Sequence, residues 1–133
     1  RDVAPSRGLG DVYKRQSEGC TVIRLENKID TDLNIRVDTV RFTQALLSAL
    51  TYPQKYKEKR EIDFKVTLDT EKNFINFRIT NSPLADERFT SQEVCIRHEI
   101  NRLLFEYFGG SYKVQTNPDG KPTILFTFPS GRN

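Results

Sequence analysis

Few side chains of this 133-residue chain could act as a nucleophile, a base or a soft-metal ligand. His98 is the single histidine, and Cys20 and Cys95 are the two cysteines. Nucleophilic catalysis needs a nucleophile beside a base, and a zinc site needs Cys or His ligands paired at short spacing. The sequence shows neither pattern, so we predict no catalytic residue and no metal site. The two cysteines are interpreted as buried, reduced thiols of a cytoplasmic protein.

The element that carries His98 is predicted to be an amphipathic helix. Thr90 and Glu93 have the spacing of a capping box, and Gly109-Gly110 supplies a left-handed C-cap. Val94 falls outside the apolar stripe, whose members recur at spacings of three and four: Ile96, Ile100, Leu103, Leu104 and Tyr107. His98 lies two residues from two members of this stripe, so we predict that it is exposed on the other side of the helix.

The remaining pattern alternates between strands and one further helix. Strands are predicted at residues 20–26, 33–37, 62–68, 75–79, 111–116 and 123–128. Asp38 is a suitable N-cap for a helix that Pro53 ends and whose apolar face comprises Val40, Phe42, Ala45, Leu46, Ala49 and Leu50. The connections are hairpin turns at 70–73 and 117–120, a loop at 81–89, and a charged, solvated run at 55–61. This order predicts an α+β fold: a two-layer α/β sandwich with a mixed, mostly antiparallel sheet and the helices on one face.

The first sixteen residues are set apart from this domain. They lack apolar periodicity and resemble translated sequencing-adapter DNA, so we interpret 1–16 as a non-native or disordered leader and 17–133 as one domain. Without the leader's four basic and two acidic residues, the net charge falls from +3 to +1. A near-neutral domain argues against a nucleic-acid or membrane surface. No apolar run approaches the roughly 20 residues that span a bilayer, so we expect no direct membrane contact.

Two segments of the domain resemble the ATPase domain of histidine kinases, in the GHKL superfamily (gyrase, heat-shock chaperone, histidine kinase, MutL). One is the helix, the Gly-Gly stop and the closing hairpin, "LLFEYFGGSYKVQTNPDGKPTILFTFP". The other, residues 41–56, reads "RFTQALLSALTYPQKY" and aligns without a gap with a family phrase such as "RLRQVLLNLLSNAIKY". Its matching residues are Arg41, Gln44, Leu46, Leu47, Leu50, Lys55 and Tyr56. The resemblance covers residues 20–129 and implies the Bergerat, or histidine-kinase ATPase-like, fold.

The resemblance also implies a nucleotide pocket whose motifs have changed. Its positions fall on Ser48, Tyr52, Lys55, Tyr56, Asn81 and Thr123. Tyr52 stands where the family has an asparagine that holds Mg²⁺, and a tyrosine hydroxyl lies too far out to replace that amide oxygen. Asn81 replaces an adenine-binding aspartate, and its amide oxygen could accept the same hydrogen bond. The glycines of that motif have become Pro83 and Ala85, and residues 87–100, in place of a glycine-rich phosphate lid, contain no glycine.

These changes predict a degenerate histidine-kinase-type ATPase domain with ATP chemistry reduced or lost. The resemblance implies ATP and Mg²⁺ as cofactors, which the changed motifs argue against. It places the domain in the C-terminal part of a sensor or signal-transduction protein, in a regulatory or protein-binding role. The location would be cytoplasmic, in a free protein or at the cytoplasmic end of a membrane-anchored sensor.

The implied partners are other signalling proteins and an upstream dimerisation and phosphotransfer region of the same protein, through which a homodimer would form. Nucleic acid is not expected. Two alternatives stay open. A divergent but active ATP-binding kinase domain would show saturable Mg²⁺-ATP binding. An unrelated α+β interaction module would show a different sheet order.

Overall fold

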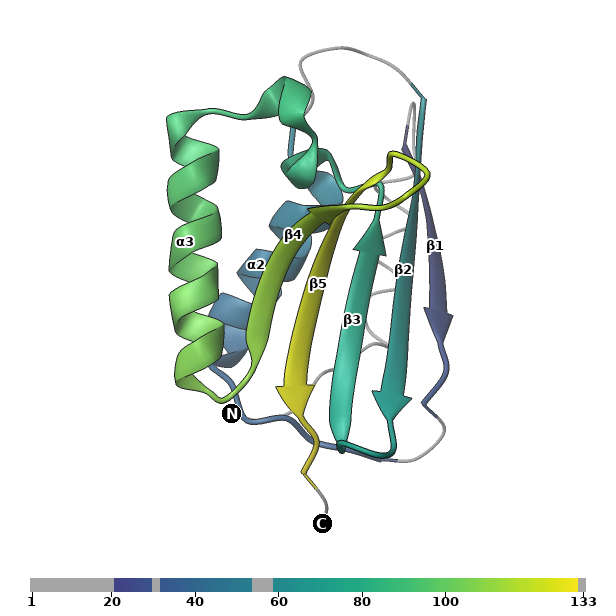
Figure 1. Ribbon diagram of the computed structural model, residues 1–133, viewed down its shortest axis with the longest axis vertical. Coiled ribbons are helices and arrows are strands. Elements are labelled where there is room, and N and C mark those ends of the chain that lie inside the picture. Colours follow the sequence, from purple (N-terminus) through teal and green to yellow (C-terminus); the bar gives the residue numbers. More distant parts are fainter. Residues whose placement is uncertain (1–20, 30–31, 54–58, 132–133) are drawn as a thin grey trace.

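The structure, a computed structural model, describes residues 21–29, 32–53 and 59–131. Along the chain the elements are β1 (Thr21–Asn27), α2 (Thr39–Thr51), β2 (Arg60–Asp69), β3 (Phe74–Thr80), the 3₁₀ turns η1 (Pro83–Ala85) and η2 (Glu87–Phe89), α3 (Gln92–Tyr107), β4 (Ser111–Thr116) and β5 (Pro122–Pro129). Figure 1 shows one sheet, with α2 crossing behind it and α3 standing beside β4.

The five strands form one mixed sheet in the order β1-β2-β3-β5-β4. β1 pairs with β2 in parallel, and the other neighbouring pairs are antiparallel. Both predicted hairpins are present, as β2–β3 and β4–β5. Although β5 is the last strand along the chain, it lies inside the sheet, between β3 and β4. The predicted sandwich with a mostly antiparallel sheet is therefore confirmed.

Aromatic side chains from both helices meet on one face of the sheet. Phe42 of α2 lies 5.2 Å from Phe77 and 5.9 Å from both Phe126 and Phe128, between ring centroids. Phe105 of α3 lies 4.9 Å from each of the same two β5 rings. All of these rings are at most 2 % exposed. Because Phe77 and Phe126 are paired across β3 and β5, their side chains share a face of the sheet, and both helices cover that face as predicted.

Helix α2 follows its sequence pattern. The Asp38 carboxylate accepts a hydrogen bond from the backbone N of Arg41 at 3.2 Å, as an N-cap does. The helix ends at its C-cap Tyr52, directly before Pro53, which cannot continue it. The predicted apolar face is buried at Phe42, Ala45, Leu46, Ala49 and Leu50. Val40 is the exception, since it lies in the first turn and is 64 % exposed.

Two connections differ from the prediction. The strand predicted at 33–37 is wrong: within the described residues, its one ladder contact is an isolated bridge between Asn34 and Gly131. Ile35 and Val37 are nevertheless 1 % exposed, so the alternation reflects burial of an extended segment rather than strand pairing. The predicted loop at 81–89 contains the two 3₁₀ turns.

Helix α3 begins one residue later than predicted and turns a different face to the core. Ser91, rather than Thr90, is the N-cap, and its hydroxyl accepts a hydrogen bond from the backbone N of Val94 at 3.2 Å. The predicted core stripe is wrong. Four of its members, Ile96, Ile100, Leu103 and Tyr107, are 52, 49, 55 and 82 % exposed, and Leu104 alone of the five packs against the core.

The face of α3 that contacts the core has the same helical spacing as the predicted stripe. It comprises Val94, His98, Asn101, Phe105 and Phe108, which are buried or half-buried. Two stripes with spacings of three and four therefore share this helix, and periodicity alone cannot choose between them. The polar side chains of His98 and Asn101 concealed the buried stripe in the sequence.

Gly109 and Gly110 end α3 for two different physical reasons. Gly109 has φ +85°, and hydrogen bonds from Gly109 N to Glu106 O (3.0 Å) and from Gly110 N to Phe105 O (2.9 Å) complete a Schellman motif. At Gly110 the constraint is space. A Cβ there would meet the carbonyl oxygen of Thr127, and the ring carbon Cδ1 of Phe128 at 2.7 Å.

We expect Gly110→Ala to lower the free energy of unfolding by roughly 3 kcal/mol, because the added methyl must push β5 away from the end of α3. Gly120→Ala is the matched control. Its φ is +87°, but nothing lies within 4 Å of an added Cβ. Gly120→Ala should therefore lower the free energy of unfolding by about 1 kcal/mol, the cost of a left-handed backbone conformation alone. Urea unfolding of both variants measures the difference. Equal losses would contradict the close approach of β5.

Candidate functional site

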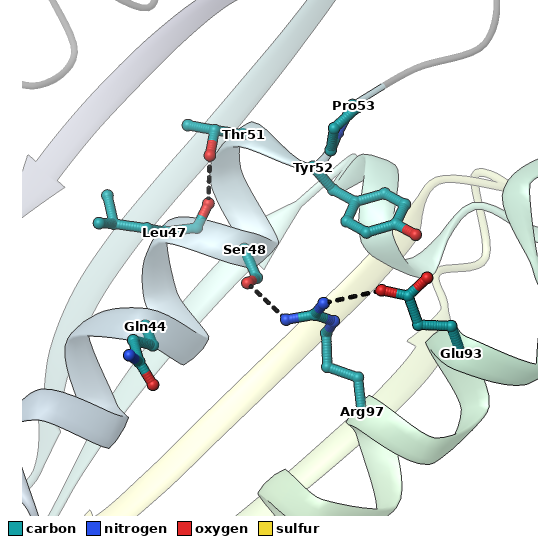
Figure 2. A pocket seen from close by; sticks show the side chains of 8 residues that line it. All are labelled: Gln44, Leu47, Ser48, Thr51, Tyr52, Pro53, Glu93 and Arg97. Carbon is teal, nitrogen blue, oxygen red and sulfur yellow. Dashed lines mark hydrogen bonds and ion pairs between the residues drawn. The ribbon is translucent and has the colours of Figure 1, made fainter.

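A cleft of about 750 Å³ separates the C-terminal part of α2 from the first turns of α3. Figure 2 shows the residues that line it: Gln44, Leu47, Ser48, Thr51, Tyr52, Pro53, Glu93 and Arg97. Amide, hydroxyl, carboxylate and guanidinium groups all reach this α2–α3 cleft. Such a mixture suits a polar ligand better than an apolar one.

Arg97 crosses the cleft from α3 and contacts α2. Its Nη1 donates to the Ser48 hydroxyl at 3.3 Å, and its Nη2 donates to Glu93 Oε2 at 3.2 Å (Figure 2). The guanidinium carbon lies 5.9 Å from the centre of the Tyr52 ring, within the range of a cation–π contact. Its Nε is buried without a hydrogen-bond partner. The side chain is 38 % exposed, so we regard these contacts as positioning the group rather than adding much stability.

A second, smaller cleft of about 350 Å³ lies where β2 begins and β3 ends. It is lined by Lys59, Arg60, Asn81, Asp86, Arg88, Gly120 and Pro122. The Arg60 side chain is 4 % exposed and its Nη2 lies 2.6 Å from Asp86 Oδ2, which Arg88 also contacts at 2.9 Å. Hydrogen bonds from Arg88 and, less strongly, from Arg60 hold the pKa of Asp86 well below its usual range. This buried charge is therefore matched from within the protein.

Asn81 lines that second cleft, and both ends of its side-chain amide are hydrogen-bonded within the protein. Its φ is +69°, a left-handed conformation that asparagine tolerates. Its backbone carbonyl and its Oδ1 both accept from Arg60 Nη1, at 3.0 and 3.1 Å, and its Nδ2 donates to the Glu61 carbonyl at 3.0 Å. Asn81 thus joins the ends of β2 and β3.

The structure places the predicted pocket residues at separate sites. Ser48 and Tyr52 line the α2–α3 cleft, and Asn81 lines the smaller cleft. Thr123 is fully buried in β5, and its hydroxyl donates to the Lys121 carbonyl at 3.2 Å. Lys55 and Tyr56 lie outside the described residues, as do Cys20 and the leader 1–16.

Sequence reasoning missed Arg97 and Ser82. Arg97 could have been found from its i,i+4 spacing to Glu93 in the first turns of a capped helix. Ser82 is fully buried, and its hydroxyl donates to the Ala49 carbonyl at 2.6 Å. It also accepts from the backbone N of Leu84 at 3.2 Å. Ser82, rather than Asn81, is therefore the residue that ties the end of β3 to α2.

His98 is half-buried against β4 rather than exposed as predicted. Its Nδ1 lies 2.6 Å from the Tyr112 hydroxyl. Burial lowers the pKa of His98 and raises the pKa of Tyr112 to about 12, so both side chains are neutral at pH 7. Cys95, predicted to be buried, is exposed. Both errors follow from the face that α3 turns to the core.

Within residues 21–29, 32–53 and 59–131, no group of three or more His, Cys, Asp or Glu side chains is arranged to hold a metal ion. No helix in these ranges is both long and apolar enough to cross a membrane.

Comparison with solved structures gives many matches to histidine kinases. The nucleotide-free catalytic domain of histidine kinase ThkA aligns with a TM-score of 0.62 at 15 % identity, over 91 % of this chain and 84 % of that one. A histidine kinase from Burkholderia phymatum gives 0.65 at 13 % identity, over 96 % of this chain and 69 % of that one. Full-length ShkA in complex with AMPPNP gives 0.69 at 17 % identity, over 96 % of this chain and 29 % of that one. This chain has the fold of a histidine-kinase ATPase domain.

At these identities the likeness concerns the histidine-kinase ATPase fold and not the chemistry. The predicted histidine-kinase ATPase-like fold is confirmed, and the described strands do not show the different sheet order expected of an unrelated α+β module. No protein-family model and no curated protein sequence matches the chain. Within this fold, the α2–α3 cleft contains Ser48 and Tyr52, the two nucleotide-pocket positions that the sequence resemblance assigns to α2.

The burial of His98 predicts a pH-dependent stability. Because the folded state lowers the pKa of His98 below its ordinary value of 6.5, the unfolded chain binds a proton more readily. We therefore expect the free energy of unfolding to fall as the pH drops from about 7.5 to about 5.5.

Urea unfolding at both pH values measures this change, and His98→Gln is the matched variant. Asp86 does not interfere, because its lowered pKa places its titration at more acidic pH. An unchanged pH dependence in His98→Gln would show that another group causes it.

Proposed function

We propose that this domain is a degenerate histidine-kinase-type ATPase domain that acts in a signalling protein through protein contacts, without Mg²⁺-dependent ATP chemistry. The observation that carries the proposal is the position of Arg97. Its guanidinium lies against Ser48 and Tyr52, the α2 positions at which the family resemblance calls for asparagines and a bound metal.

A guanidinium in this place is unfavourable for Mg²⁺. The metal requires several hard oxygen ligands in near-octahedral geometry. The Ser48 hydroxyl already accepts a hydrogen bond from Arg97, and Tyr52 presents its ring rather than an oxygen to the cation. The Glu93 carboxylate is also paired with Arg97. The positive charge of the Arg97 guanidinium, which lies beside Ser48 and Tyr52, would in addition repel a divalent cation bound there.

The segment between β3 and α3 gives further support. Leu84 of η1 is 2 % exposed, and Ser82 is bound to the Ala49 carbonyl of α2. Asp86 caps η2 and pairs with the buried Arg60. These contacts fix the segment against α2 and β2. A phosphate-binding loop instead needs small residues with backbone donors directed at the ligand.

The partners we propose are an upstream dimerisation and phosphotransfer region of the same protein and other signalling proteins, in a cytoplasmic location. Support comes from the matched structures, several of which are longer than this fold. The chain covers 29 % of full-length ShkA and 70 % of the cytoplasmic segment of histidine kinase QseC.

The proposal predicts that Mg²⁺-ATP and Mg²⁺-ADP do not stabilise the domain. A ligand at about 100 times its Kd would add about 2.7 kcal/mol, or several degrees in Tm for a domain of this size. Thermal unfolding with millimolar nucleotide, with and without Mg²⁺, measures the shift, and phosphate release from ATP measures turnover. A competent histidine-kinase catalytic domain serves as the positive control.

A Mg²⁺-dependent shift would overturn the proposal and favour the alternative of a divergent, active ATP-binding kinase domain. Two variants then test whether any nucleotide binds in the α2–α3 cleft: Arg97→Gln changes an arginine that lines it, and Arg102→Gln changes a similarly exposed arginine of α3 that does not. A metal-independent shift lost only in Arg97→Gln would support a cleft that has kept ligand binding without metal chemistry.

A further inference from the structure

The outer face of α3 exposes a second apolar stripe, made of Ile96, Ile100, Leu103 and Tyr107. These side chains are 52, 49, 55 and 82 % exposed, and they account for four of the six large hydrophobic residues exposed in the described part of the chain. Figure 1 shows α3 at the β4 end of the molecule, with no described element on its far side. An apolar stripe of this size on a soluble domain marks an interaction surface.

The spacing within the stripe indicates what kind of element would cover it. The intervals are four, three and four residues, which is the a/d pattern of two successive heptads. Such a seam receives the side chains of another helix, knobs into holes, and is not matched to a strand edge or a flat polar surface. Of the helices described, only α3 has this seam exposed, since the apolar face of α2 is buried apart from Val40.

The charges beside the stripe are compatible with a second copy. Arg102 donates to Glu99 and, at 3.1 Å, to Glu106 within the same helix. Because both carboxylates already have a partner, two copies of α3 would not be forced apart by unpaired like charges. The charged residues beside the stripe are of both signs, so they do not favour a partner that carries a strong charge of one sign.

We propose that the domain self-associates by antiparallel packing of α3 against α3 of a second copy. In this register, Tyr107 packs against Ile96 of the second copy, and Ile100 packs against its Leu103. The most exposed and bulkiest residue thus meets a smaller one at each end, whereas a parallel pair would place Tyr107 on its own counterpart. This surface is separate from the α2–α3 cleft, and the proposal does not depend on the proposed function.

The exposed area sets the strength of this association. A large side chain exposes about 150–250 Å² when free, so the four exposed fractions leave on the order of 500 Å² for each copy. Two copies would bury about 1,000 Å², the lower end of specific interfaces. We therefore expect a reversible dimer that forms at tens to hundreds of micromolar, rather than an obligate one.

Sedimentation equilibrium of the full chain over roughly 5–500 µM tests the proposal. The wild-type mass should rise toward that of a dimer, and Ile100→Glu and Leu103→Glu should remain monomeric. Both positions are exposed, so circular dichroism should show an unchanged fold. Val40→Glu is the control, since it changes another exposed apolar residue on α2 and should dimerise like the wild type. A monomer at every concentration, or dimers that persist in both stripe variants, would overturn the proposal.

Cysteine crosslinking tests the orientation, in a background with Cys20→Ser and Cys95→Ser. An antiparallel pair brings Ile96→Cys of one copy to Tyr107→Cys of the other, so mixing the two variants should give a disulfide-linked heterodimer. Like residues at position 96 would then lie about 16 Å apart along the helix axis and should not crosslink. A crosslink of Ile96→Cys with itself, and none in the mixture, would indicate a parallel pair and contradict the antiparallel register.

Discussion

The placement of both helices on the sheet depends on the aromatic cluster at the centre of the domain. Phe126 and Phe128 of β5 contact Phe42 of α2 and Phe105 of α3, and the two helix residues lie 6.3 Å apart. These edge-to-face and tilted ring contacts set how far apart the helices lie and which side each turns inward. Phe42 is near the start of α2 and Phe105 near the end of α3. The opposite ends of the two helices are therefore free to separate, and that is where the α2–α3 cleft lies.

Pattern and local chemistry were sufficient for most of the fold. The α2 cap at Asp38, both hairpins and the Gly109 stop depend on interactions among neighbouring residues, which a sequence displays directly. The rotation of α3 depends instead on a contact across the domain. The face that contains Phe105 is buried, rather than the more apolar stripe from Ile96 to Tyr107, because Phe105 packs against the rings of β5. His98 and Asn101 lie on the same face and are buried or half-buried with it. No property of the helix taken alone reveals that choice.

The site was less predictable than the fold for a related reason. The resemblance supplied Ser48 and Tyr52 by position in a gapless helix, and these two do line one cleft. Asn81 was assigned from a loop motif whose glycines have gone. Without them, the turn after β3 directs Asn81 toward β2 and Ser82 toward α2. Arg97 matches none of the family motifs named above. Its pairing with Glu93 shows as an i,i+4 spacing in the sequence, but its contacts with Ser48 and Tyr52 of α2 are visible only in three dimensions.

The place of β5 in the sheet also bears on how the domain is made. A ribosome releases the chain from its N-terminus, and of the described strands β5 emerges last, although it lies between β3 and β4. Until β5 appears, the edge of β3 that pairs with it stays open. Phe42 and Phe105 also lack the two β5 rings, Phe126 and Phe128, against which they pack. Completion of the sheet and of its aromatic cluster must therefore await the synthesis of β5. A nascent chain arrested before residue 122 has helices and a hairpin but lacks Ile124, Phe126 and Phe128, three fully buried residues at the centre of the core. We expect such a chain to be a substrate for chaperones and proteases rather than a partly working domain.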